Sequence, residues 1–157
     1  DLRTIMEALA DAAHQTKDPE QLTELVRERL APSITARLVG ADRSVNVLAL
    51  DPRIEDTLRR TLRDIASGAG GGIDPELIRA LGDKVEAALP KFGALGAPPV
   101  LVAPPDVRRF VRAIFERKIP QLSVVSFREI EPSVSLRVVE TLSLPVPNGL
   151  PAATRTA

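Results

Sequence analysis

The stretch from Pro98 to Ile130 constrains the fold of this chain more than any other. A short aliphatic run at 100–102 precedes a proline pair, and a second apolar run covers 122–127. Between the two runs lies an amphipathic segment that ends near Lys118. This order of strand, helix and strand fits one crossover between two parallel strands. We therefore predict a right-handed βαβ unit within an α/β domain.

The helix of this crossover is predicted to bury one apolar stripe and expose a charged face. Helical spacing assigns four side chains to the buried stripe: Val107, Phe110, Val111 and Ile114. The mostly basic remainder is expected to cover the outer face: Arg108, Arg109, Arg112, Glu116 and Arg117.

Three Asp-Pro pairs predict three helix starts, at 18–19, 51–52 and 74–75. An aspartate before a helix accepts a hydrogen bond from a free backbone N–H, and proline is preset for the first helical position. The first of these helices carries apolar residues every four positions as far as Leu38. Pro32 interrupts that pattern and is expected to kink or divide the helix near Leu30.

The chain divides into three predicted parts. Residues 1–40 read as a helical hairpin, part of a helical subdomain, and 41–144 as a small α/β domain. In that domain we expect a strand at 45–50, a glycine-rich linker at 67–72, a loop at 90–99 and a further strand at 134–138. The last strand alternates apolar and polar residues, and its short connection predicts an antiparallel neighbour and hence a mixed sheet. The composition from 145 to 157 predicts a disordered tail.

The composition excludes several classes of function. Lys plus Arg and Asp plus Glu both number 21, which disfavours a nucleic-acid binder that works by charge. There is no Cys, and hence no disulfide or thiol nucleophile. Trp and Tyr are absent, so stacking platforms for single strands are missing. No apolar run is long enough to span a membrane.

No constellation of catalytic residues is evident, and we expect no cofactor and no metal. His14 is the single histidine and stands near a helix end, where an imidazole suits the helix dipole. An alternative is a small α/β enzyme with a site at the C-terminal ends of the parallel strands. The residues expected at such a site are Pro104, Pro105, Asp106, Ser126 and Glu129.

Arginines on two predicted helices are the candidates for protein interaction. They are Arg59 and Arg63 on one helix and Arg109 and Arg112 on the crossover helix. Arginine forks suit carboxylate pairing at interfaces. A solvated, ion-paired helix face remains the alternative for each of them.

Four stretches in order resemble a known family. They are DLRTI at 1–5, KDP and LTE at 17–24, LDP with IE at 50–55, and DVRRFVR with VVSF between 106 and 127. Together they are similar to the C-terminal cytoplasmic region of the type III secretion export gate, which injectisomes and flagella share. Val125 and Phe127 depart from that family's pattern, which prefers Leu and Tyr there.

The resemblance implies a non-catalytic docking module. It implies that the chain holds the end of a helical third subdomain and the whole of an α/β fourth subdomain. Both would lie at the cytoplasmic face of the bacterial inner membrane, and the membrane-spanning half of the protein would lie outside this chain. Family members form a nonameric ring that receives chaperone–substrate complexes, gatekeeper proteins and other export-apparatus subunits. No nucleic acid and no membrane contact are expected for this fragment. The Arg108-Arg109 pair favours the injectisome branch over the flagellar one.

Overall fold

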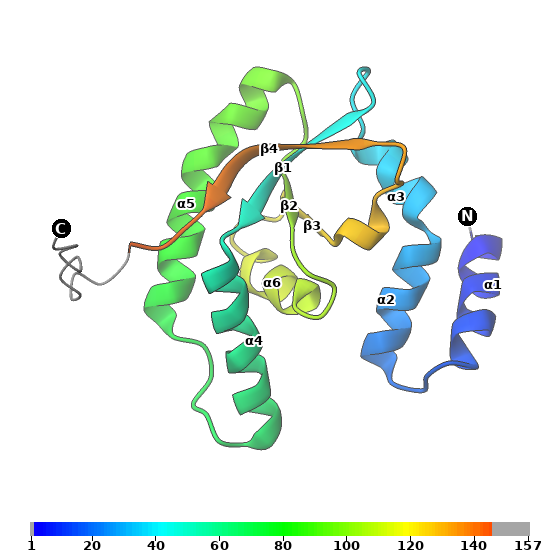
Figure 1. Cartoon of the computed structure of the whole chain (residues 1–157), viewed down its shortest axis with the longest axis horizontal. Coiled ribbons are helices and arrows are strands. Elements are labelled where there is room, and N and C mark those ends of the chain that lie inside the picture. Colours follow the sequence, from blue (N-terminus) through cyan, green and yellow to red (C-terminus); the bar gives the residue numbers. More distant parts are fainter. Residues whose placement is uncertain (1, 146–157) are drawn as a thin grey trace, which may run out of the picture.

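The computed structural model describes residues 2–145, and the predicted tail lies outside them from residue 146 onward. Over this range the chain forms three helices, then an α/β unit (Figure 1). The elements are α1 (Leu2–Ala13), α2 (Pro19–Arg29), α3 (Ala31–Leu38), β1 (Ser44–Leu50), α4 (Pro52–Ser67), α5 (Pro75–Leu95), β2 (Val100–Val102), α6 (Arg108–Phe115), β3 (Ser123–Val125), a short 3-10 turn η1 (Phe127–Glu129) and β4 (Ser135–Leu142). Within residues 2–145, every helix is too short or too polar to cross a bilayer.

The four strands form one parallel sheet in the order β3-β2-β1-β4. Leu101 lies between Leu48 of β1 and Val124 of β3, which confirms the predicted parallel crossover. The prediction of an antiparallel last strand was wrong. The segment 126–134 does not turn back along β3 but crosses to the opposite edge, where Ser135 pairs with Ser44 and β4 runs parallel to β1. The α/β fold class is confirmed, with a wholly parallel sheet over the described residues.

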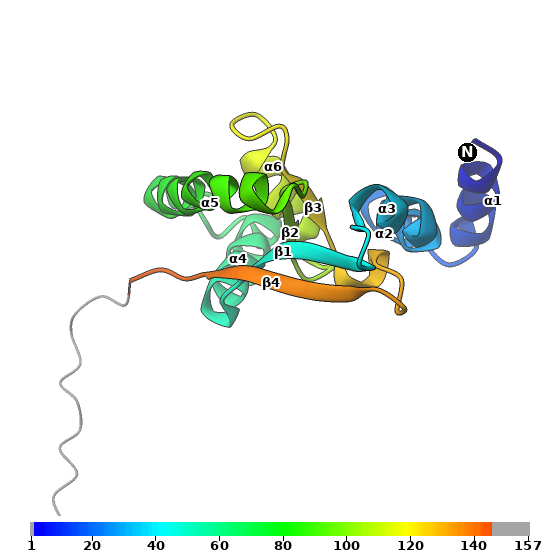
Figure 2. The ribbon, with the colours of Figure 1, turned by 90° about the horizontal axis from the view of Figure 1, so that it is seen from above.

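Two apolar clusters cover the two faces of the sheet. Leu48, Leu101 and Val124 point toward α4, α5 and α6, and form the larger cluster. Val45, Val47, Val100 and Val125 point the other way, toward α3 and the segment that leads to β4. Figure 2 shows α5 and α6 on one side of the sheet and α1 to α3 beside it. A third, small cluster joins α1 to α2 through Ala8, Ala12 and Val26.

All three predicted Asp-Pro helix starts are confirmed. Asp18, Asp51 and Asp74 each accept a hydrogen bond from the backbone N–H two residues on, at 2.9, 2.8 and 3.0 Å. Proline follows each aspartate in the first turn. The glycine-rich linker is confirmed as well: Gly68 ends α4 at φ 71°, in the left-handed region that glycine adopts without strain.

Asp51→Ala is expected to lower the free energy of unfolding by about 1 kcal/mol, because it removes the acceptor at the start of α4. Urea unfolding followed by circular dichroism measures the change. Asp51→Asn is the matched control, since its amide oxygen accepts the same bond. A loss of equal size in the control would contradict the capping role.

Prolines at two positions act differently on the helices. The predicted division near Leu30 is confirmed, because α2 ends at Arg29 and α3 begins at Ala31 with Pro32 in its first turn. The predicted loop at 90–99 was wrong, because α5 continues through Pro90 to Leu95. Pro90 removes one helical hydrogen bond. The helix persists because Ala88 and Phe92, on either side of Pro90, are fully packed into the larger cluster.

Two apolar residues of β4 are exposed, although they alternate with polar residues as in a strand with one buried face. Leu136 and Val138 lie opposite Val45 and Val47, yet they are 39% and 57% exposed. The cluster under α3 reaches β1 but not these two side chains. A register shift follows, so that Glu140 and not Val139 pairs with Leu48. This bulge turns the end of β4 toward the other face, where Leu142 is buried.

Candidate protein-interaction surface

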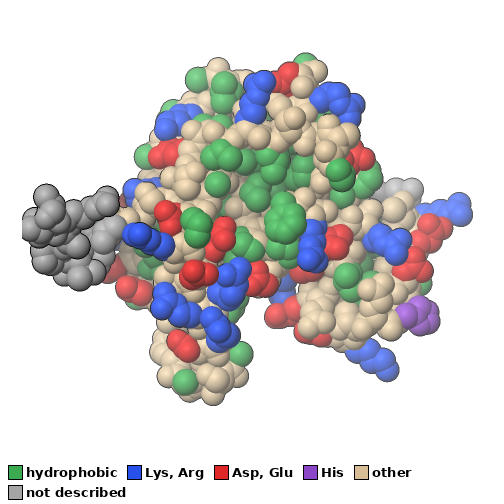
Figure 3. All heavy atoms as spheres, in the orientation of Figure 1, with side chains coloured by type: hydrophobic (Ala, Val, Ile, Leu, Met, Phe, Trp, Pro, Cys, Tyr) green, Lys and Arg blue, Asp and Glu red, His purple; other side chains and the backbone are tan. Residues whose placement is uncertain are grey.

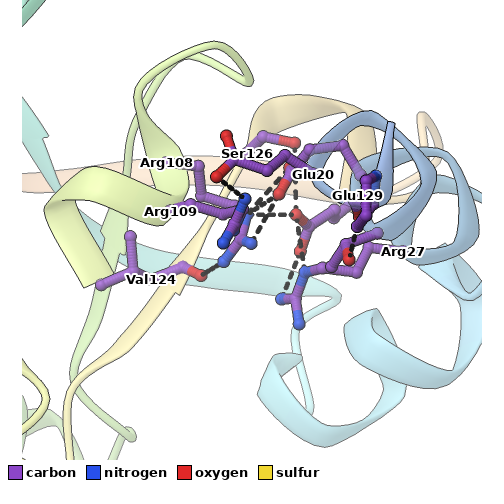
Figure 4. A network of polar contacts seen from close by, with 10 residues as sticks. Glu20, Arg27, Arg108, Arg109, Val124, Ser126 and Glu129 are labelled. Atoms are coloured by element: carbon purple, nitrogen blue, oxygen red, sulfur yellow. Dashed lines mark hydrogen bonds and ion pairs between the residues drawn. The ribbon is translucent and has the colours of Figure 1, made fainter. Parts of the chain in front are cut away.

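A buried ionic cluster joins the helical segment to the α/β unit at the N-terminal end of α6 (Figure 4). Arg108, predicted to be exposed, is only 5% exposed. Its Nη2 lies 2.6 Å from Glu24 Oε1 on α2, and its Nε lies 3.2 Å from Glu129 Oε1 on η1. Its Nη1 also donates to the carbonyl of Val124 at 3.4 Å. The prediction for Arg108 was therefore wrong.

Glu129 is the centre of this cluster and is fully buried. Arg27 of α2 forms two bonds with its carboxylate, Nη2–Oε2 at 2.6 Å and Nε–Oε1 at 3.1 Å. The Ser126 hydroxyl donates to the same carboxylate at 3.5 Å. Two arginines therefore face two glutamates (Arg27, Arg108, Glu24 and Glu129), and their charges cancel.

The charge of Arg108 is stabilised by its neighbours. Burial opposes the charged form, but Glu24 and Glu129 outweigh it and hold the pKa of Arg108 above its ordinary value. The cluster can clamp α2 against α6 and η1.

The sequence contained a signal for the burial of Arg108. Its position lies on the same helical stripe as the buried Val111 and Phe115, at spacings of three and seven residues. The prediction missed this because it centred the buried stripe on the apolar residues Phe110 and Ile114, whereas both are only partly buried. A charged residue on the buried stripe of a helix indicates a partner charge elsewhere in the chain.

The two predicted interaction arginines of α6 have different surroundings. Arg109 is exposed and pairs with Glu20 at the start of α2, Nη1–Oε1 2.9 Å. Arg112 is half-buried and donates from Nη1 to the carbonyl of Leu122 at 2.9 Å. Both lie on the side of α6 that faces the helical segment and β3.

The two predicted arginines of α4 differ in their ion pairs. Arg59 pairs with Asp106 in the loop before α6 and with Asp56 one turn earlier. The Arg59 guanidinium holds the pKa of Asp106 below its usual range, although burial opposes this. Arg63 is exposed and makes no ion pair with any described residue. Figure 3 shows basic and acidic side chains interspersed over α4 on one face.

The residues expected at an enzyme site do not converge. Ser126 and Glu129 belong to the buried cluster. Pro105 and Asp106 instead line a groove beside Glu20 and Arg109. Among residues 2–145 no three His, Asp or Glu side chains are grouped so that they could hold a metal ion. His14 is exposed just after α1.

Relatives of known sequence are proteins of bacterial flagella and of calcium-response loci. The chain is 34% identical over 142 residues to the flagellar biosynthesis protein FlhA of Salmonella typhimurium, covering 90% of this chain and 20% of that protein. It is 24% identical over 143 residues to the low calcium response locus protein D of Yersinia pestis, covering 91% of this chain and 20% of that protein. The chain thus spans about one fifth of the length of these relatives.

Three solved structures have the same fold, and one of them is a cytosolic domain from a type III secretion system. The MxiA protein of Shigella flexneri superposes with a TM-score of 0.73 at 27% identity, over 90% of this chain and 44% of that one. The complex of the Chlamydia pneumoniae proteins CdsV and CdsO superposes with a TM-score of 0.70 at 32% identity, over 91% of this chain and 42% of that one. The nonameric EscV cytosolic domain from the type III secretion system superposes with a TM-score of 0.70 at 30% identity, over 90% of this chain and 41% of that one.

The family is shown by a match that covers most of the chain. The sequence model of the FHIPEP family matches residues 1–135, which include all the elements except β4. This match contains the four sequence stretches that resembled the export gate. The chain belongs to the FHIPEP family, as part of the C-terminal cytoplasmic region of the type III export gate.

Proposed function

We propose that this chain is a non-catalytic docking module of the export gate that receives chaperone–substrate complexes and gatekeeper proteins. The observation that carries the proposal is the contrast between its buried and exposed charges. The buried ones neutralise one another between α2, α6 and η1, whereas Arg63 and Arg109 stand on exposed helix faces. Exposed arginines on rigid elements suit repeated docking and release by partners with carboxylates.

The relatives support a place for the module within a ring. The EscV cytosolic domain is nonameric, and CdsV forms a complex with CdsO. By analogy, the full-length protein would contribute this chain to a nonameric ring at the cytoplasmic face of the bacterial inner membrane. Other export-apparatus subunits would bind the same ring. The division into a helical subdomain (1–40) and an α/β subdomain (41–144) stays a proposal too.

Charge reversal at Arg59, Arg63, Arg109 and Arg112 together is expected to abolish capture of chaperone–substrate complexes in a pull-down. Four reversed charges replace attraction by repulsion across the contact. The matched control reverses four exposed arginines on other elements: Arg29, Arg79, Arg128 and Arg137. Thermal unfolding shows whether each variant is folded. Unchanged binding by the folded test variant would remove these residues from the proposal, and loss confined to the control would place the contact elsewhere.

A further inference from the structure

A groove of about 770 Å³ runs between α2, α3, α6 and the outer edge of β3. We call it the β3 groove. Its volume lies in the range of ligand-binding clefts. Ile34 and Leu38, both partly buried, contribute apolar side chains to its wall. The charged residues that line it are five arginines and one glutamate: Arg27, Arg37, Arg108, Arg109, Arg112 and Glu116.

Two of the five arginines have no carboxylate partner among the described residues. Arg27, Arg108 and Arg109 are paired with Glu129, Glu24 and Glu20. Arg37 forms no ion pair within residues 2–145, and Arg112 bonds only the carbonyl of Leu122. The groove therefore presents two guanidinium groups whose charge is not cancelled by an ion pair.

The groove also runs along an open strand edge. β3 pairs with β2, and within the described chain no strand lies on its other side. Ser123 N–H and Val125 C=O bond toward β2. Strand alternation then directs the N–H and C=O of Val124 outward, and that carbonyl already accepts from Arg108. The Val124 N–H is left facing the groove as a donor.

We propose that the β3 groove binds an acidic, extended segment of a partner protein. Carboxylates of the segment pair with Arg37 and Arg112, and its backbone lies beside Val124, with alternate apolar side chains against Ile34 and Leu38. An acidic segment is favoured because Arg37 and Arg112 line the groove without an ion-pair partner among the described residues, against the single lining carboxylate of Glu116. The inference rests on the proposed docking function and specifies the chemistry of one partner.

The test uses a fluorescein-labelled octapeptide of alternating glutamate and valine, titrated with the full chain by fluorescence polarisation. We expect saturable binding that weakens as salt rises. Arg37→Glu combined with Arg112→Gln is expected to weaken it about tenfold or more, because two charge-assisted pairs are lost. The glutamine retains a donor for the Leu122 carbonyl. Arg79→Glu with Arg137→Glu, on α5 and β4, is the control pair and is expected to leave the affinity unchanged.

A second readout locates the peptide. Its binding is expected to slow hydrogen exchange at the Val124 amide, measured by NMR, and to leave amides of α5 unaffected. The inference is overturned by an absence of binding at millimolar peptide, by equal binding of the lysine–valine counterpart, or by equal loss in the control pair. Displacement of the peptide by a single-stranded oligonucleotide, with the same dependence on Arg37 and Arg112, would assign the groove to nucleic acid and also overturn it.

The two proposals can fail separately. If the four-arginine reversal abolishes capture of chaperone–substrate complexes while the wild-type chain ignores the acidic peptide, the docking function stands and the β3 groove is not its site. If the peptide binds as expected but capture is unchanged in the four-arginine variant, the groove is a site for an acidic segment and the proposed docking surface falls.

Discussion

Arg108→Met is expected to lower the free energy of unfolding by about 3 kcal/mol, the largest effect we predict for a single charged residue. The methionine fills similar volume but leaves Glu129 fully buried with Arg27 as its one remaining arginine. Glu24 loses its bonds to Arg108 at the same time. Stability falls because the buried carboxylate of Glu129 keeps only one of its two arginine partners. Urea unfolding at neutral pH measures this loss of free energy.

The control and the rescue for this prediction come from the same interface. Arg128→Met removes a similar arginine–glutamate pair between η1 and α2, with Glu28, but the pair is exposed and its loss should cost below about 1 kcal/mol. Arg108→Met combined with Glu129→Leu is expected to regain much of the stability, because an apolar replacement removes the uncompensated charge. The backbone carbonyl of Glu129 keeps its bond from Thr35 in that variant. Additive losses in the double variant would contradict a coupled buried cluster.

Phe92→Ala is expected to cost about 3–5 kcal/mol, because it leaves a large cavity in the main cluster. Phe92 is 1% exposed and lies two residues after Pro90 in the last turns of α5. The packing of Phe92 stabilises the end of α5 and compensates for the helical hydrogen bond that Pro90 removes. We expect the helix to end near Pro90 in the variant, with a loss of helical circular dichroism beyond that of a single side chain.

Leu95→Ala provides the matched control on the same helix. Leu95 is 56% exposed, so its truncation is expected to change stability by less than about 0.5 kcal/mol. The two variants differ in burial and share the proline, and so they separate packing from helix propensity. A similar loss in both would mean that the end of α5 is held by something other than Phe92.

Several features were predictable because they depend on neighbours in the chain. The three aspartate caps need only an acceptor two residues before a free N–H and a proline beside it. The division at Leu30 follows from the ring of Pro32. The parallel pair β2 and β3 follows from the length of the crossover and from its helix.

The candidate site was predicted in part. Arg63 and Arg109 are exposed on helices, as their positions indicated. Arg108 was missed because its burial needs Glu24 and Glu129, which lie 84 residues before it on α2 and shortly after it on η1. Helical spacing places Arg108 on the same stripe as Val111 and Phe115, but it does not say which distant carboxylates the guanidinium will meet.

The sequence by itself determined where helices begin, which stretches form strands and which family the chain resembles, since each depends on local hydrogen bonding, backbone geometry or residue order. Tertiary structure alone decided the direction of β4, the course of α5 through Pro90 and the burial of Arg108. The physical reason is common to all three. A strand direction, a missing helical bond and a buried charge are each tolerated only when distant parts of the chain supply the pairing or packing that compensates for them.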